Sequence, residues 1–286
     1  MKIFITSQDS LLGAELNNSL SDGFICTGST GDIFTSTQND LLFMLERENP
    51  DIIIHNCEVS SLRFCEENPR KSFKINSLLT KKVAKAADRL DSLMVYFSSF
   101  QVFSGKKGNA YYEFDRPDPA NVYGWSKWWG EHYVSSLSNN NYLVLRLPLL
   151  FGLKGNEEDN LLLSKTFSHF NHYVDPLFEY ITNPTWATHV SNIVLDLLCA
   201  REWGTYHVGN TGTADVKQFM KAVIEEKGFS NANYYLDILS GNYHRDYRYK
   251  VLQSAYLPFH SVVRDLPNWR DALKECLKML PHYKRY

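Results

Sequence analysis

The hydrophobic positions along the chain follow two alternating patterns. Short runs rich in β-branched or aromatic residues, such as KIFIT at 2–6 and DIIIHN at 51–56, predict buried strands. Between them lie longer segments with apolar residues at helical spacing, among them LLGAELNNSL at 11–20. Strands that alternate with helices indicate βαβ units and therefore an α/β protein with a parallel sheet.

This alternation continues to about residue 150 and loosens beyond it. The last regular strand of the first part is YLVLRLP at 142–148. We therefore predict a Rossmann-like doubly wound domain at 1–153 and a smaller, partly interleaved substrate-binding lobe at 154–286, with segments near 183–212 returning to the first domain. Ligands of such a sheet bind outside the carboxyl ends of its strands.

Composition and charge exclude several classes of protein. The chain has 286 residues, 44% of them hydrophobic, and its net charge of -2 gives no basic surface for nucleic acid. Its five cysteines are scattered and form no C-x-x-C pair, so we expect reduced, buried thiols and no metal site. The start MKIFIT lacks the features of a signal peptide, and no apolar run reaches membrane-spanning length. We expect a soluble, cytoplasmic protein.

The loop after the first strand differs from a typical dinucleotide-binding turn. Its three glycine positions read Ser7, Ser10 and Gly13, and only Gly13 can serve the close packing of helix on strand. Serine hydroxyls and the N–H groups of the helix start can still bind phosphate, but a Cβ restricts the turn and stands where a pyrophosphate would lie. The second strand ends in CTGSTGD, with Ser29 and Thr30 in place of the acid that holds a ribose. The loop alone leaves dinucleotide binding open.

The stretch NVYGWSKWWGE at 121–131 carries the candidate chemistry. Tyr123 and Lys127 are four residues apart and so share one face of the predicted helix. An ammonium beside a phenol favours the phenolate, so we expect the pKa of Tyr123 to fall from about 10 towards working pH. The phenol would then be a usable proton donor to a carbonyl oxygen. The spacing alone fits a surface contact equally well.

The order of the segments resembles the extended short-chain dehydrogenase/reductases, and within them the dTDP-4-dehydrorhamnose reductase branch. DPANVYGWSKWWGE at 118–131 closely matches that family's Pro-x-Asn-x-Tyr-Gly-x-Ser-Lys-x-x-Gly-Glu segment. Further matching segments follow the family's order over nearly the whole chain: PDIIIHN (50–56), ENPRKSFKINS (67–77), SSFQVFSG (98–105), LRLPLLFG (145–152), NPTWATHV (183–190), GTYHVGNTG (204–212) and LPNWRDALKECL (266–277).

The resemblance implies an enzyme that reduces the 4-keto group of a nucleotide-linked deoxysugar with NADPH or NADH. It implies that Tyr123 donates the proton, that Lys127 also holds the nicotinamide ribose, and that Ser99 hydrogen-bonds the same carbonyl. The cofactor-binding residues that we expect are Ser7, Ser10, Leu11, Leu12, Gly13, Ser29, Asn56, Asn76 and Lys127.

The departures from the family concern the sugar. Phe100 and Gln101 replace an Asp and a Tyr beside the catalytic hydroxyl, so we expect both to contact a substrate other than the usual one. Arg248, in RDYRYKVL at 245–252, is the candidate contact for a diphosphate, since a guanidinium fork suits phosphate oxygens.

Two other functions fit the same resemblance. Ser7 and Ser10 favour a non-catalytic regulatory protein, like the regulatory subunit of methionine adenosyltransferase, which belongs to this branch. A sugar-nucleotide epimerase or dehydratase would need a second acid or base near the sugar. In each case the helix that carries Trp128 and Trp129 could contribute to a homodimer.

Overall fold

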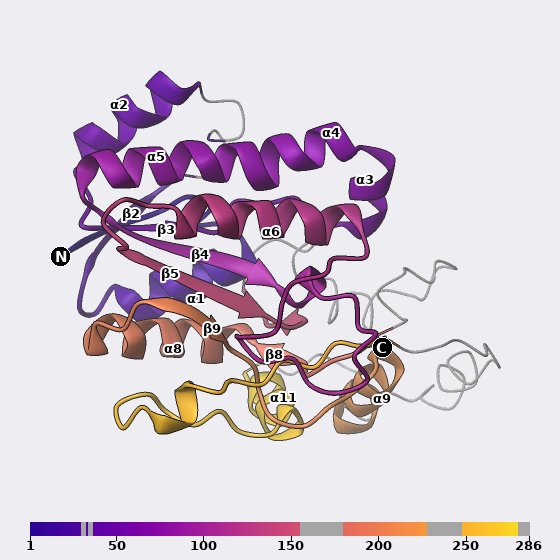
Figure 1. Cartoon of the computed structure of the whole chain (residues 1–286). Coiled ribbons are helices and arrows are strands. Elements are labelled where there is room, and N and C mark those ends of the chain that lie inside the picture. The colour runs from indigo at the N-terminus through magenta and orange to yellow at the C-terminus, as the bar shows by residue number, and fades with distance from the viewer. Residues whose placement is uncertain (30–32, 34–36, 155–179, 228–247, 280–286) are drawn as a thin grey trace, which may run out of the picture.

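A twisted parallel sheet forms the centre of the protein (Figure 1). The computed structural model describes residues 1–29, 33, 37–154, 180–227 and 248–279. Among these residues, six parallel strands pair in the order β2 (Ile25–Gly28), β1 (Lys2–Ile5), β3 (Ile52–His55), β4 (Leu93–Ser99), β5 (Tyr142–Leu147) and β9 (Gly204–His207). The predicted Rossmann-like α/β fold is confirmed.

Helices cover both faces of the sheet (Figure 1). One face carries α1 (Leu11–Leu20) and α8 (Ala187–Ala200), and the other carries α2 (Gln38–Glu48), α5 (Thr80–Leu90) and α6 (Val122–Ser135). Every residue of β3 and β4 is buried, as expected for central strands of a parallel sheet that are covered on both faces.

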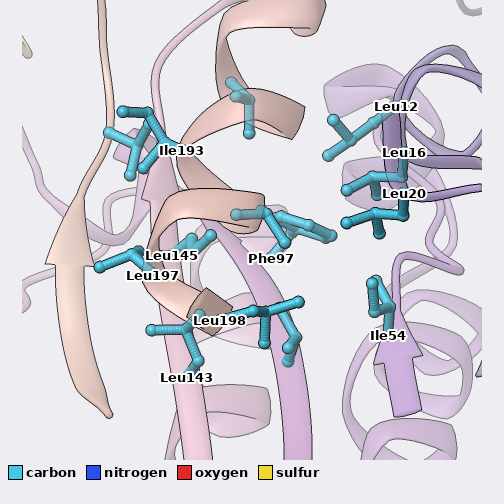
Figure 2. Packing of buried hydrophobic residues seen from close by; sticks show 14 of the residues in the cluster. Leu12, Leu16, Leu20, Ile54, Phe97, Leu143, Leu145, Ile193, Leu197 and Leu198 are labelled. Carbon is cyan, nitrogen blue, oxygen red and sulfur yellow. The ribbon is translucent and has the colours of Figure 1, made fainter. Parts of the chain in front are cut away.

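Figure 2 shows how the α1 and α8 face packs. Leu12, Leu16 and Leu20 recur every four residues along α1, so they form one apolar stripe against the sheet. The helix α8 contributes Ile193 and Leu197 to the same cluster. This packing fixes α1, and therefore the loop that precedes it, against the carboxyl end of β1.

The helical segment at 69–90 is not regular throughout, although its sequence predicts one long helix over about 70–90. It consists of α4 (Pro69–Ser72), the π-helix η2 (Phe73–Leu79) and α5, and it follows α3 (Leu62–Glu67). A π-helical turn within an α-helix often occurs at a functional site. Here it contains Asn76.

The remaining elements lie below the sheet in Figure 1 or at its edge. They are η3 (Phe100–Val102), β6 (Leu150–Phe151), β7 (Tyr180–Ile181), β8 (Thr185–Trp186), α9 (Val216–Lys227), β10 (Arg248–Tyr249), η5 (Leu257–Phe259) and α11 (Trp269–Lys278). β6 pairs with β8, and β7 pairs with β10. The apolar spacing of DNLLLSKTFSHF at 159–170 predicts a further helix, but residues 159–170 and the segment 175–179 lie outside the described residues. The predicted division into domains stays a prediction.

The five cysteines are free thiols. Cys57, Cys65 and Cys276 are buried as expected, but Cys199 is exposed near the end of α8, where the expectation of burial is wrong. Within the described ranges, no helix combines the length and apolarity needed to cross a membrane. The same part of the chain shows no cluster of three or more His, Cys, Asp or Glu residues suited to a metal ion.

Candidate active site

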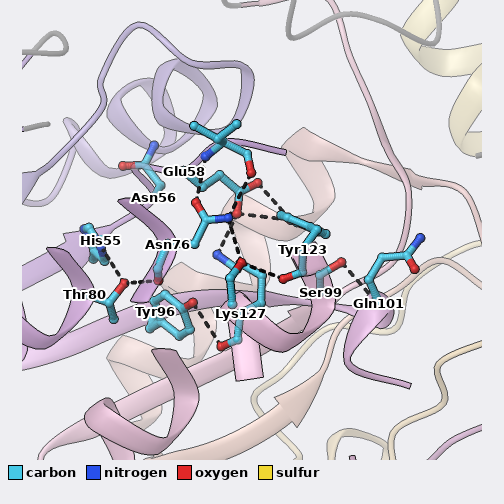
Figure 3. Close-up of polar contacts among 12 residues, drawn as sticks. His55, Asn56, Glu58, Asn76, Thr80, Tyr96, Ser99, Gln101, Tyr123 and Lys127 are labelled. Carbon is cyan, nitrogen blue, oxygen red and sulfur yellow. Dashed lines mark hydrogen bonds and ion pairs between the residues drawn. The ribbon is translucent and has the colours of Figure 1, made fainter. Parts of the chain in front are cut away.

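The structure brings Ser99, Tyr123 and Lys127 together beyond the carboxyl end of β4 (Figure 3). Ser99 is the last residue of β4, and its hydroxyl accepts a hydrogen bond of 3.2 Å from the backbone N–H of Gln101. Tyr123 and Lys127 lie one turn apart on α6, and their exposed fractions are only 6% and 2%. This edge of the sheet is where the fold predicts a ligand site.

Asn121 sets the start of α6. Its side chain accepts a hydrogen bond of 2.7 Å from the N–H of Gly124 and so caps the helix. Gly124 then allows the helix to approach the loop after β4, because a Cβ there would lie 2.1 Å from the carbonyl oxygen of Gln101. The cap and the glycine together hold Tyr123 against Ser99.

Glu58 completes the site, and the sequence analysis missed it. Its carboxylate lies between the two α6 side chains in Figure 3, 2.6 Å from Nζ of Lys127 and with both oxygens 3.2 Å from the Tyr123 hydroxyl. A signal was present in the sequence, because Glu58 comes three residues after the end of β3 and parallel strands end at one edge.

The Glu58 carboxylate changes the expected electrostatics. Burial raises the pKa of Tyr123 well above 10, and Glu58 raises it further, while a hydrogen bond with Ser99 opposes the shift. The expected lowering of this pKa by Lys127 is therefore wrong, because the ammonium pairs with Glu58. Burial alone would lower the pKa of Lys127, but the Glu58 carboxylate raises it above its ordinary value, so Lys127 stays charged.

Asn76 fixes the loop that carries Glu58. Its side-chain oxygen accepts from the N–H of Val59 at 2.8 Å, and its amide nitrogen donates to the Val59 carbonyl at 3.0 Å and to the Ser126 hydroxyl at 2.9 Å. Asn76 thus joins η2, the loop after β3 and α6. These hydrogen bonds are all within the protein, and the expected contact of Asn76 with a cofactor stays a prediction.

The serine-containing loop is closed by hydrogen bonds with Asn56, which follows β3, and by the Ser10 side chain. Asn56 accepts from the N–H of Ser7 at 3.0 Å, and it donates to the Ser7 carbonyl at 2.7 Å and to the Ser10 hydroxyl at 2.9 Å. The Ser10 hydroxyl also caps α1 by accepting from the N–H of Gly13. A Cβ at Gly13 would lie 1.8 Å from the Ser7 carbonyl oxygen, so the predicted role of Gly13 in close packing is confirmed.

The other expected cofactor residues lie near this loop. Leu11 and Leu12 bury their side chains in the core, so they offer a ligand only their backbone groups in the first turn of α1. Ser29 donates its hydroxyl to the Thr6 carbonyl at 3.2 Å. In the described part of the chain, neither first-turn N–H of Leu11 and Leu12 has an acceptor. These donors fit the phosphate groups of a dinucleotide.

The expected substrate residues form a second cluster, on the far side of Ser99 from Lys127. Gln101 is buried and points away from Lys127 in Figure 3. Its side-chain oxygen Oε1 accepts from Nζ of Lys250 at 2.7 Å and from the side-chain amide of Asn121 at 2.9 Å. Its amide nitrogen is buried and has no acceptor within the described residues.

Lys250 is a residue that the sequence analysis did not select. It is fully buried, its ammonium lies 4.3 Å from the centre of the Tyr180 ring, and no carboxylate of the described residues pairs with it. Burial lowers its pKa to about 7, with a smaller contribution from Arg248. Arg248 itself is half-buried on β10, beside Gly105, and its expected contact with a diphosphate stays a prediction. Phe100 is buried and meets Tyr180 edge to face, 6.1 Å between ring centres.

Comparisons with known proteins agree with this arrangement. The chain is 27% identical over 286 residues to the spore coat polysaccharide biosynthesis protein SpsK of Bacillus subtilis, covering 97% of each chain. It is 25% identical over 236 residues to a dTDP-4-dehydrorhamnose reductase of Burkholderia thailandensis, covering 78% of each.

A solved structure shows the same fold. The dTDP-4-dehydrorhamnose reductase of Bacillus anthracis, in complex with NADP, aligns with a TM-score of 0.82 at 23% identity, over 98% of this chain and 99% of that one. The model of the family described as "RmlD substrate binding domain" matches residues 1–281. The predicted resemblance is confirmed, and the chain belongs to the RmlD substrate binding domain family.

Proposed function

We propose that the protein is an NAD(P)H-dependent reductase of a nucleotide-linked keto sugar, with Tyr123 as the proton donor. The observation that carries this proposal is the buried set of Ser99, Tyr123 and Lys127 at the carboxyl end of β4, in a chain of this family. The relative from Burkholderia thailandensis, named as a dTDP-4-dehydrorhamnose reductase, supports the same class of substrate.

The residues of the site divide the chemistry between them. The raised pKa keeps the Tyr123 phenol protonated at neutral pH, so the proton for the carbonyl oxygen is in place, but the phenol is a weaker acid than an unshifted tyrosine. The Ser99 hydroxyl would orient that oxygen, and the charge of Lys127 would favour the negative charge that develops on it and on the phenol. A reduced nicotinamide, when bound, supplies the hydride to the carbonyl carbon.

The same residues define where the cofactor would be held. The first-turn N–H groups of Leu11 and Leu12 would bind its phosphates, and Lys127 would bind its ribose. The sequence CTGSTGD at the end of β2 has Ser29 where an acid would hold the ribose and contains no arginine for a 2′-phosphate, so it favours neither nicotinamide cofactor. Calorimetric titration with NADPH and NADH separately is the measurement that identifies the preferred one.

A Tyr123→Phe substitution tests the catalytic assignment. We expect turnover of a nucleotide-linked 4-keto sugar to fall by about 10²–10⁴-fold, because the phenol proton is lost while the ring still packs. Cofactor affinity should change little. Tyr133→Phe, on the same helix but away from the site, is the matched control. A Tyr123→Phe protein with parental turnover would show that another group donates the proton.

One observation favours the regulatory alternative. Glu58 already pairs with the ammonium of Lys127, and Asn56 already bonds to the serine loop, so Lys127 and the two serines have partners within the protein. A regulator of this kind would bind neither cofactor up to millimolar concentration, and its affinity for a partner protein would not respond to Tyr123→Phe. The two titrations therefore separate the alternatives before any substrate is known.

A further inference from the structure

Tyr123 is buried, whereas the neighbouring Glu58 side chain is partly exposed to solvent. The exposed fraction of Tyr123 is 6%, and that of the Lys127 side chain is 3%. The Glu58 side chain is 29% exposed, although its carboxylate contacts both. Glu58 is thus the half-buried member of the set, in contact with the solvent on one side and with the phenol on the other.

We propose that Glu58 returns a proton from solvent to Tyr123 after each turnover. The inference rests on the proposed function, since it concerns the step that follows the reduction. It makes Glu58 a catalytic residue, because its carboxylate contacts the hydroxyl that reacts.

The proton balance involves Tyr123, Glu58 and one proton from the solvent. Tyr123 gives its hydroxyl proton to the substrate oxygen, which becomes an alcohol as the carbonyl carbon receives its hydride, and the phenol is left as phenolate. The Glu58 carboxylate accepts a proton from a hydronium ion or a buffer acid at its exposed side. The O–H bond of this protonated Glu58 then breaks as a new O–H bond forms on Tyr123, so both residues return to their starting state and each turnover consumes one proton from the solvent.

The geometry keeps Glu58 in place for this role. Its ion pair with Lys127 is 2.6 Å long, and its neighbour Val59 is held by two hydrogen bonds from Asn76. Because both carboxylate oxygens are 3.2 Å from the phenol, a proton can pass from either oxygen without a change of rotamer.

The surrounding titratable side chains are poor carriers. Three of them are buried and uncharged near neutral pH: His55, Cys57 and Tyr96. Burial lowers the pKa of His55 to about 3 and raises the pKa of Cys57 and of Tyr96 to about 12. Two further carboxylates have other partners, since Asp9 accepts from Ser7 and Glu131 pairs with an arginine.

Proton exchange at Tyr123 can be measured without cofactor or substrate. At neutral pH, the Tyr123 hydroxyl signal is assigned by NMR from its loss in Tyr123→Phe, and the rate at which its proton exchanges with solvent is measured. We expect this exchange to be at least about ten-fold slower in Glu58→Ala than in the parent. Added formate should restore the rate in Glu58→Ala, because a small acid can replace the lost carboxyl group. Glu58→Asp should be intermediate.

Glu67→Gln is the matched control, since it removes an exposed carboxylate from α3, and neither its rate nor its response to formate should change. Glu58→Gln keeps a polar group beside Lys127 and guards against loss of folding. Unchanged exchange in both Glu58→Ala and Glu58→Gln would overturn the proposal. The proposal would also be overturned if the Glu58 variants bound the cofactor more tightly while proton exchange at Tyr123 was unchanged. Glu58 would then only compete with the cofactor for Lys127.

Turnover is the second measurement, and it separates the two proposals. If the parent protein reduces a keto sugar, Glu58→Ala should slow the reaction and formate should accelerate it again. If the parent protein reduces no keto sugar, the proposed function fails, while the hydroxyl-exchange experiment still decides the role of Glu58.

Discussion

Burial in the folded protein brings the pKa of Lys250 close to neutral pH. Its ammonium donates to the side-chain amide oxygen (Oε1) of Gln101 in the interior, and burial lowers its pKa to about 7. A neutral amine can still donate this hydrogen bond. We therefore expect the pair to persist on both sides of neutrality, while the cost of burying a charge is present only on the acid side.

The pH dependence of stability tests this expectation. Between about pH 7 and pH 10.5 the unfolded chain binds the Lys250 proton more than the folded protein does, so the free energy of unfolding rises with pH. Below pH 7 both states are protonated and the slope vanishes. Relative to Lys250→Met, the parent should gain up to about 1.4 kcal/mol per pH unit in this window, measured by urea unfolding. Lys221→Met, at an exposed site, should run parallel to the parent. Equal slopes for the parent and Lys250→Met would show that Lys250 is charged throughout.

The sequence predicted only some of the individual residues of the site. Tyr123, Lys127 and Ser99 could be predicted because motif spacing and strand ends carry local information. The place of Glu58 soon after β3 was a signal that it lies near the site, but its contact with Tyr123, 65 positions away, could not be predicted, and neither could the contact of Lys250 with Gln101, 149 positions away. The pKa of Tyr123 was predicted in the wrong direction for the same reason.

The position of α6 depends on its glycine as much as on its cap. Gly124 faces the carbonyl of Gln101, and Gly130 faces the Tyr96 hydroxyl, where a Cβ would lie 2.2 Å away. Two glycines six residues apart thus let one helix pack closely on β4 and on the loop after it. This contact is what holds Tyr123 near Ser99.

Gly124→Ala should therefore move the helix. A Cβ 2.1 Å from the Gln101 carbonyl forces α6 or η3 to shift, and overpacking of this kind costs about 1–3 kcal/mol. We expect a lower urea midpoint together with lost turnover. Gly23→Ala, where a Cβ would meet nothing within 4 Å, should change stability by less than about 0.5 kcal/mol. Equal urea midpoints for Gly124→Ala and Gly23→Ala would show that α6 can accommodate a Cβ at position 124 without strain.

Element prediction succeeded where periodicity was strong. The strands KIFIT, DIIIHN and YLVLRLP and the helix α1 follow directly from runs of buried apolar residues. The π-helix at η2 could not be predicted, because its hydrogen-bond shift depends on tertiary contacts of Asn76. The two-residue strands β6, β7, β8 and β10 are too short to show a period.

At the scale of the whole molecule, a buried charged network joins the sheet to the C-terminal segment. Arg146 on β5 makes two hydrogen bonds of 2.9 Å to Glu131 on α6, and it also contacts His207 on β9. The other nitrogen of His207 faces the carbonyls of Tyr111 and Gln253, and burial lowers the pKa of this imidazole to about 4. The neutral ring thus connects three parts of the chain.

Breaking this network should affect global stability. Arg146→Met leaves the Glu131 carboxylate buried and unpaired, which costs about 3–5 kcal/mol. Thermal unfolding should shift to a clearly lower temperature. Arg264→Met is the comparison, because its pair with Asp196 is half exposed and such pairs contribute about 0–1 kcal/mol. Similar losses in the two variants would show that burial adds nothing to the Arg146 pair.

The three tryptophans of α6 form an intrinsic spectroscopic probe on the helix that carries Tyr123. The ring centres of Trp125 and Trp128 are 5.3 Å apart, and those of Trp128 and Trp129 are 6.1 Å apart. Indoles at such distances share their electronic excitation, so their combined circular dichroism depends on the angles between the rings. Trp128 also packs against the cluster that contains Tyr123. Light absorbed by this helix therefore reports on the geometry around the reactive phenol, and no dye has to be attached.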